Sequence, residues 1–195
     1  MILQLATHNP HKRREFARLL RGAGEVEVEL VQLPAGVALP PEDGSTFAEN
    51  ARAKALAAAA QTGQVSIADD SGIEAEALGG APGVRAARYA GESASDAENL
   101  AKLLREAPAG SRLRYVCALA YVDPADGAVR MFEGHCSGRL AAEPRGERGF
   151  GYDPAFLPDA GPPGRTMAEL GDVQKDAISH RGHAVRALLE WLTAG

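Results

Sequence analysis

The sequence has few cysteines, few lysines and no long apolar run. Its two cysteines, Cys117 and Cys136, show no C-x-x-C spacing and lie in strand-like segments, which predicts buried free thiols. No apolar stretch approaches the length that spans a bilayer, and the first residues lack the basic region of a signal peptide. We therefore expect a cytoplasmic protein with no membrane partner.

The net charge of −5 argues against nucleic acid as an obligatory partner. An anionic small molecule stays compatible with this charge if its site concentrates cations. The chain has 195 residues, of which 45% are hydrophobic and 24% charged, and these values are ordinary for a globular protein. We expect one domain over residues 1–195.

Lysine is the rarer cation, because 17 of the 21 basic residues are arginine. In a chain biased toward arginine, a lysine marks a position where a compact ammonium matters, for example against phosphate. Lys12, Lys54 and Lys175 are the candidates, whereas Lys102 lies on an ordinary amphipathic helix. An incidental lysine stays an alternative at each position.

Apolar periodicity and capping signals predict alternating strands and helices, followed by a hairpin. The expected strands cover residues 2–6, 25–31, 65–69, 113–122 and 128–136. The expected helices begin at Asn9-Pro10, at capping boxes from Thr46 and Ser95, and at Ser179. Residues 71–91 and 146–164 are predicted to lack regular secondary structure. The order favours a mixed-sheet α/β fold with a smaller hairpin lobe.

Two adjacent carboxylates, Asp69 and Asp70, follow the apolar run 65–68 and precede the turn-like pair Ser71-Gly72. Ligand sites of open α/β sheets lie beyond the carboxyl ends of strands. Ionising two neighbouring carboxylates costs little free energy only when a cation or a proton lies between them. A hard divalent metal ion can be that cation. The structural alternative is that the pair caps a turn or a helix.

The segment 7–12, Thr-His-Asn-Pro-His-Lys, joins the first strand to the first helix. Such a turn offers free backbone N–H groups at the positive end of a helix, and Thr7, Asn9 and Lys12 add donors and charge. The segment is no Walker-type loop. The alternative makes Asn9 only a cap and Lys12 a solvated residue.

Three further groups of polar residues stand where structure alone does not require them. Glu42 lies in a proline-rich loop before the capping box that uses Glu49. Residues 149–154, Gly-Phe-Gly-Tyr-Asp-Pro, can press aromatic rings against a flat ligand such as a nucleobase, or can plug the core. The third group lies near the start of the last helix and consists of Lys175 and residues 179–181, Ser-His-Arg. Hydrogen-bond donors at a helix start favour an electronegative atom of a ligand.

Seven short blocks together resemble the signature of the inosine/xanthosine triphosphate pyrophosphatase family, the non-canonical purine NTP pyrophosphatases. The blocks are ATHNPHK (6–12), EDGSTFAENA (42–51), ADDSG (68–72), GGAPGV (79–84), FGYDP (150–154), TMAEL (166–170) and SHRG (179–182). The resemblance covers nearly the whole chain. It implies Mg²⁺-dependent hydrolysis of ITP, dITP or XTP to the monophosphate and pyrophosphate. It also implies an elongated mixed β-sheet flanked by helices, two lobes with a central substrate cleft, and a homodimer.

Residue roles follow from the same resemblance and, for Asp69 and the lysines, from the charges that the reaction must offset. Asp70 is expected to accept the proton of the attacking water and to bind Mg²⁺ with Glu42, while Asp69 tunes Asp70 or completes the metal shell. Lys12, Lys54 and Lys175 are expected to offset phosphate charge. The expected substrate contacts are Thr7, His8, Asn9, Pro10, His11 and Lys12 for phosphate, Ser71, and Phe150, Gly151, Tyr152, Asp153, Lys175, His180 and Arg181 for base and sugar. His8 stands where many relatives have glycine, and residues 171–174 are less acidic than the family pattern.

Base selectivity is expected to follow from the 6-position of the purine, a carbonyl in inosine and xanthosine and an amino group in adenosine. Donors from His180, Arg181 or the backbone match the carbonyl and stay unpaired against the amino group, at about 1–3 kcal/mol for each mismatch. Two alternatives stay open. One is a pyrophosphatase for pyrimidine or modified nucleotides, and the other is a nucleotide-binding sensor without turnover.

Overall fold

The computed structural model describes residues 1–21 and 27–194, and their strands form one mixed sheet. The strand order is β2-β1-β3-β4-β5-β6. β1 (Ile2–Leu5) pairs in parallel with β2 (Glu29–Gln32) and with β3 (Ser66–Ala75). β4 (Arg112–Val122) lies between β3 and β5 (Val129–Leu140), and β5 pairs antiparallel with β6 (Phe156–Pro158). The predicted mixed α/β sheet is confirmed.

The α-helices of the described residues begin where the capping signals predict, with one addition. They are α1 (Pro10–Arg21), α2 (Phe47–Thr62), α3 (Asp96–Glu106), α4 (Asp172–Ile178) and α5 (His180–Ala194). Both predicted capping boxes are present, Thr46 with Glu49 and Ser95 with Glu98. The added helix, α4, was not predicted. None of the helices in the described residues is long and apolar enough to cross a membrane.

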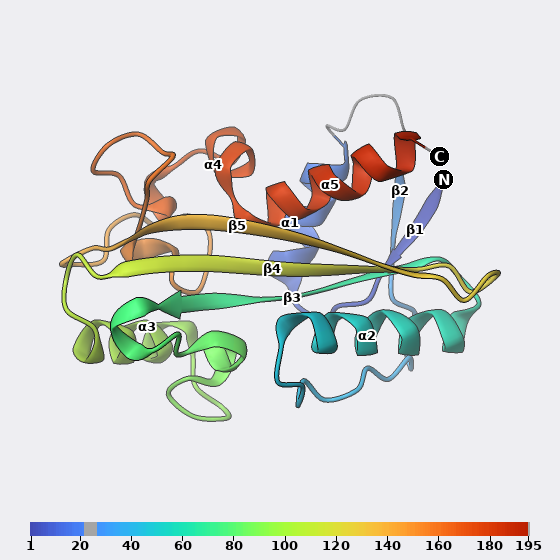
Figure 1. Cartoon of the computed structure of the whole chain (residues 1–195), viewed down its shortest axis with the longest axis horizontal. Helices are drawn as coiled ribbons and strands as arrows, with labels where there is room; N and C mark the ends of the chain where they lie inside the picture. The colour runs from blue at the N-terminus through green and yellow to red at the C-terminus, as the bar shows by residue number, and fades with distance from the viewer. Residues whose placement is uncertain (22–26, 195) are drawn as a thin grey trace. The chain divides into compact units, whose positions relative to one another are not determined.

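The contacts divide the chain into two compact units, and the prediction of a single domain stays a prediction. Unit 1 contains residues 1–70, 117–134 and 181–195, and unit 2 contains residues 71–116 and 135–180. In unit 1, α2 covers one face of the sheet and α1 and α5 cover the other (Figure 1). The elongated outline, the two lobes and the cleft also stay predictions.

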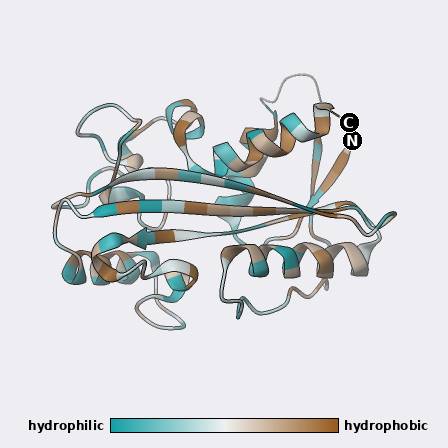
Figure 2. Ribbon diagram, viewed as in Figure 1, coloured by the Kyte–Doolittle hydropathy of each residue, from teal (hydrophilic) through white to brown (hydrophobic). Residues whose placement is uncertain are grey.

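Each unit has its own hydrophobic core. Buried residues of the unit 1 core come from β1, α1, β3, the second half of β4 and α5, and include Leu3, Phe16, Ile67, Leu119 and Leu188. The unit 2 core includes Ile73, Leu103, Tyr115, Phe156 and Met167. β4 becomes predominantly hydrophobic along its second half (Figure 2). Cys117 and Cys136 are free and buried, as predicted.

Three sequence expectations need correction. β3 does not end at Asp69 but runs through Ser71-Gly72 to Ala75, because Ile73 and Ala75 continue the buried alternation and strand pairing outweighs the local turn preference. The stretch 71–91 therefore contains strand and two 3₁₀ helices, Glu76–Leu78 and Gly83–Arg88. The expected loop 146–164 contains β6 and the 3₁₀ helix Asp153–Ala155. The first two residues of the expected strand 25–31 lie outside the described residues.

Candidate active site

The turn between β1 and α1 is built by its own side chains. The Thr7 Oγ1 accepts a hydrogen bond from the Asn9 N–H at 3.2 Å. The Asn9 Oδ1 accepts from the N–H groups of His11 at 2.9 Å and Lys12 at 3.2 Å, which is N-terminal capping with Pro10 at the first helical position. The His8 side chain is exposed. The turn therefore fixes the position of Lys12 in the first turn of α1.

β1 ends at Leu5, whereas β3 continues beyond its pairing with β1 at Ile67. Asp69 and Asp70 thus lie in the middle of β3, not beyond its end, and just past the carboxyl end of the neighbouring parallel strand. Successive residues of a strand point to opposite faces, so the two carboxylates have different surroundings. The Asp69 Oδ2 lies 3.0 Å from the Lys12 Nζ. The Asp70 Oδ2 accepts a hydrogen bond of 2.8 Å from the Asn50 Nδ2 of α2.

These surroundings move the pKa values of the two carboxyl groups in opposite directions. Burial is the largest influence on Asp69 and would raise its pKa, but the charges of Lys12, Arg181 and Lys54 together hold it well below its usual range. Burial also dominates at Asp70, and there the pKa stays raised although Lys54 and Lys12 oppose the shift. Asp69 is therefore a fixed anion, and Asp70 is the carboxylate suited to take up a proton.

Asn50 was not singled out from the sequence, yet its amide joins two parts of the site. The Oδ1 accepts from the Gly44 N–H at 2.8 Å, and the Nδ2 donates to Asp70. A Cβ on Gly44 would lie 2.6 Å from the Asn50 Oδ1, so this contact needs glycine. The link ties the loop that carries Glu42 to β3. The clue to Asn50 in the sequence was its place in the block 42–51, directly after the capping residue Glu49.

Lys54 lies among the carboxylates of unit 1. Its buried ammonium contacts the Glu42 carboxylate and donates to the Asp69 carbonyl oxygen at 2.7 Å. Burial would lower its pKa, but Asp69, Glu42 and Asp70 raise it on balance, so Lys54 stays charged. Glu49 by contrast is used by the capping box, where it accepts from Ser45 and Thr46. The capping box thus uses Glu49, whereas Glu42 contacts the Lys54 ammonium.

The carboxylates of Glu42 and Asp70 fit a hard cation. Both offer oxygen donors, and the Glu42 charge raises the pKa of Asp70, which a shared cation would relieve. Among the described residues, no group of three or more His, Cys, Asp or Glu could hold a metal ion. Two protein carboxylates are enough for Mg²⁺, which takes its other ligands from water and substrate phosphate. The donor set therefore suits magnesium rather than zinc.

Arg181 was expected to contact base and sugar, and the structure places it in unit 1 with acidic partners. Its side chain is about as buried as the core leucines, with a residue exposure of 1%. The guanidinium contacts the Glu15 carboxylate and lies 3.1 Å from the Asp69 Oδ2. Glu15 was missed, although it lies three residues after Lys12 on the same face of α1. A substrate contact of Arg181 stays a prediction.

Unit 2 holds a second group of predicted residues, centred on the buried Asp153 carboxylate. The Asp153 Oδ2 accepts from the Lys175 Nζ at 2.6 Å and from the Phe150 N–H at 3.0 Å. The Lys175 ammonium lies 5.4 Å from the centre of the Phe150 ring. Gly149 has φ +74°, and a Cβ there would lie 2.0 Å from the Asp153 Oδ2. The glycine is needed for this close approach.

The other predicted residues of unit 2 have mixed surroundings. His180 is buried and stacks on Tyr115, with ring centres 4.6 Å apart and an angle of 6° between the planes. Tyr152 is buried, and its hydroxyl donates to the Ala86 carbonyl oxygen at 2.7 Å, so this aromatic plugs the core. The Gly151 N–H donates to the Asp96 Oδ2 at 2.9 Å. Ser71 is half-buried within β3.

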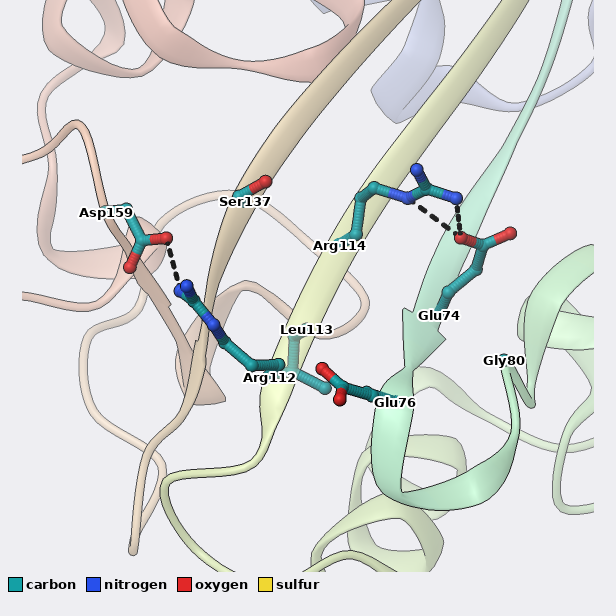
Figure 3. A pocket seen from close by; sticks show the side chains of 8 residues that line it. All are labelled: Glu74, Glu76, Gly80, Arg112, Leu113, Arg114, Ser137 and Asp159. Atoms are coloured by element: carbon teal, nitrogen blue, oxygen red, sulfur yellow. Dashed lines mark hydrogen bonds and ion pairs between the residues drawn. The ribbon is translucent and has the colours of Figure 1, made fainter.

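A pocket in unit 2 contains none of the predicted site residues. It is lined by Glu74, Glu76, Gly80, Arg112, Leu113, Arg114, Ser137 and Asp159 (Figure 3). Arg114 pairs with Glu74 at 2.6 Å, and Arg112 pairs with Asp159 at 2.9 Å. Both arginines of this pocket are thus paired with acidic side chains, and we assign the pocket no part in the site.

Comparison with known proteins matches the chain to one family. The Ham1 family model covers residues 3–191. A dITP/XTP pyrophosphatase of Cutibacterium acnes is 47% identical over 196 residues, covering 97% of this chain and 95% of the relative. Another, of Geobacillus kaustophilus, is 48% identical over 191 residues, covering 95% and 91%.

Solved structures give the same result. A HAM1 protein from Coxiella burnetii superimposes with a TM-score of 0.87 at 40% identity, covering all of both chains. A nucleoside-triphosphatase, dITP/XTP pyrophosphatase, from Mycobacterium abscessus has a TM-score of 0.73 at 41% identity, covering 98% of this chain and 100% of the other. The chain therefore belongs to the Ham1 family.

Proposed function

We propose that this chain hydrolyses the non-canonical purine nucleotides dITP, ITP and XTP to the monophosphate and pyrophosphate. Family membership and the named activity of relatives at 46–48% identity support the reaction. Within the structure, one observation carries the proposal: two adjacent buried carboxylates contact different partners beside a helix start, Asp69 the cations of Lys12 and Arg181 and Asp70 the amide of Asn50, with the buried Lys54 ammonium bonded to the Asp69 carbonyl oxygen. This arrangement suits water activation next to an anionic substrate.

The phosphates are bound by the β1–α1 turn and the lysines around it. Negative charge is favoured at the start of α1, where the N–H groups of Asn9, His11 and Lys12 donate to the Thr7 and Asn9 side chains. Lys12 and Lys54 supply fixed positive charge, and both are already held by carboxylates. A substrate phosphate therefore competes with these carboxylates for the two ammonium groups.

Asp70 takes the proton of the attacking water. Its raised pKa brings it closer to neutral pH, where a general base is most effective, and Asn50 fixes the orientation of its carboxylate. Glu42 and Asp70 would hold Mg²⁺, which when bound neutralises phosphate charge and promotes ionisation of a coordinated water. Asp69 stays ionised and holds Lys12 and Arg181 in place. No covalent nucleophile is needed.

The base and sugar are bound by the unit 2 residues. His180 and Lys175 provide donors for the 6-carbonyl of inosine or xanthosine, and Phe150 provides an aromatic face. Gly151, Asp153 and Ser71 belong to the same proposed set, in which Asp153 acts by holding Lys175 and the Phe150 backbone. Tyr152 supports this set from the core, where its hydroxyl donates to the Ala86 carbonyl oxygen. The homodimer and the cytoplasmic location are likewise proposals, resting on the family resemblance.

The test is to incubate the purified protein with Mg²⁺ and dITP, ITP, XTP, GTP or ATP, and to measure pyrophosphate and orthophosphate separately. We expect pyrophosphate from the first three and little from GTP or ATP. Orthophosphate would mean attack at the terminal phosphate and would refute the mechanism. Tight binding of ITP without release of either product would instead favour a sensor, and pyrophosphate from pyrimidine nucleotides would favour that alternative substrate class.

A further inference from the structure

Tyr115 of β4 contacts both halves of the unit 2 group, and nothing in the sequence singled it out. Its side chain is buried, and the alternation of β4 points it toward the core of unit 2 with Leu113. Its ring centre lies 4.6 Å from that of Phe156, tilted by 48°, which supports the ring from within the core. Position alone would make Tyr115 an ordinary core residue.

The hydroxyl sets it apart, because it donates to the Asp153 Oδ1 at 3.1 Å inside the protein. The second oxygen of that carboxylate already accepts from Lys175 and from the Phe150 N–H. Three donors from three places in the sequence therefore fix the Asp153 carboxylate in one orientation. A carboxylate held in this way in turn fixes the Lys175 ammonium, since buried charges stay close to their partners.

The ring of the same tyrosine determines how His180 lies. The two rings are 4.6 Å apart and nearly parallel, with an angle of 6°. Stacking against a supported ring restricts rotation of the imidazole and fixes the directions in which its two nitrogens point. One side chain thus constrains both proposed base-reading donors, the Lys175 ammonium through Asp153 and the imidazole directly.

We propose that Tyr115 is a positioning residue for base recognition, acting through its hydroxyl on Asp153 and through its ring on His180. This inference rests on the proposed function, which assigns Lys175 and His180 to the base. A tyrosine that only filled the core would act through its ring alone. The hydroxyl is therefore the part that separates positioning from packing.

The experiment compares Tyr115→Phe, which keeps the ring and removes the hydroxyl, with Tyr121→Phe on the same strand in unit 1. Binding of inosine monophosphate is measured by calorimetry, and kcat and KM are measured for dITP. We expect Tyr115→Phe to raise Kd and KM about fivefold to tenfold with kcat within about twofold, and Tyr121→Phe to change none of them. Unchanged Kd and KM in a folded Tyr115→Phe protein would overturn the proposal.

A double-mutant cycle with Asp153→Asn tests the route of the effect. If the hydroxyl acts through Asp153, Tyr115→Phe adds little in the Asp153→Asn background, whereas an independent packing effect adds in full and contradicts the proposal. Failure of the proposed function shows separately, as a wild-type protein that binds inosine monophosphate but releases no pyrophosphate. A wild-type protein that does not bind inosine monophosphate overturns the positioning role together with the base site.

Discussion

Asp69 and Asp70 are adjacent in sequence, but their carboxylates leave β3 on opposite faces and contact different partners. Asp69 pairs with Lys12 and Arg181, whereas Asp70 accepts a hydrogen bond from Asn50. The strand period makes this division unavoidable for neighbouring residues. It gives each carboxylate its own partners, so the contributions of the two can be separated by mutation.

Replacement of Asp70 by asparagine should abolish turnover while dITP binding survives. The amide keeps the shape, and its oxygen still accepts from Asn50, but it takes up no proton. A general base contributes about 10²–10⁴ to the rate, so kcat should fall by about a thousandfold, with Kd for dITP within about threefold. The control is Asp43→Asn on the exposed side of the same loop as Glu42. An active Asp70→Asn protein would remove Asp70 from the base role.

Replacement of Asp69 by asparagine should mainly cost stability. Asp69 is fully buried and its change leaves Lys12 and Arg181 without this partner, so the free energy of unfolding should fall by about 3–5 kcal/mol at pH 7. Because the folded pKa lies below the unfolded value of about 3.9, this contribution is present above pH 4 and is lost as the pH falls further. Urea unfolding at pH 7 and pH 3.5 should show a smaller difference from wild type at the lower pH. A difference independent of pH would contradict the assignment.

Replacement of His180 by alanine should narrow the preference for ITP over ATP. In our proposal the imidazole, which stacks on Tyr115, is a donor to the base, and an unmatched donor disfavours the adenine amino group. We expect the ratio of kcat/KM values to fall by about tenfold or more, mostly through weaker use of ITP. His183→Ala, an exposed histidine on α5, serves as the control. An unchanged ratio would refute the reading role.

Replacement of Gly149 by alanine should weaken substrate binding far more than replacement of Gly164. Both glycines have positive φ, +74° and +72°, so both substitutions strain the backbone similarly. Only at Gly149 would the new Cβ meet a side chain, at 2.0 Å from the Asp153 Oδ2 and 3.1 Å from the Lys175 Nζ. We expect KM for dITP to rise about tenfold or more for Gly149→Ala alone. Equal effects at the two positions would mean that strain, not displacement of Asp153, is responsible.

The fold could be predicted from sequence where the signals are local. The caps at Asn9, Thr46 and Ser95 fix helix starts through bonds within three residues, and all three were predicted. β3 was cut short because Ser71-Gly72 has turn chemistry, and the pairing that overrides it comes from strands distant in sequence. Local propensity carries no information about such partners.

The candidate site divides in the same way. Asp69, Asp70 and Lys12 could be found because motif and turn chemistry place them, and the structure brings them together. Asn50, Glu15 and Tyr115 could not be found in this way, because the side chains that they bind lie 20, 166 and 38 residues away in the sequence. A buried polar residue looks like any other until the structure supplies the group that it satisfies.

Asn50 also shows that the site selects polarity as well as shape. Its amide oxygen faces the Gly44 N–H, which can only donate, and its amide nitrogen faces the Asp70 carboxylate. Aspartate has almost the same outline, but it would set a second negative charge against Asp70, and leucine would leave both neighbours unsatisfied. An amide is thus the group that can connect the Glu42 loop to β3. We expect any viable change at position 50 to be accompanied by changes at positions 44 and 70, so that these three positions vary together in evolution.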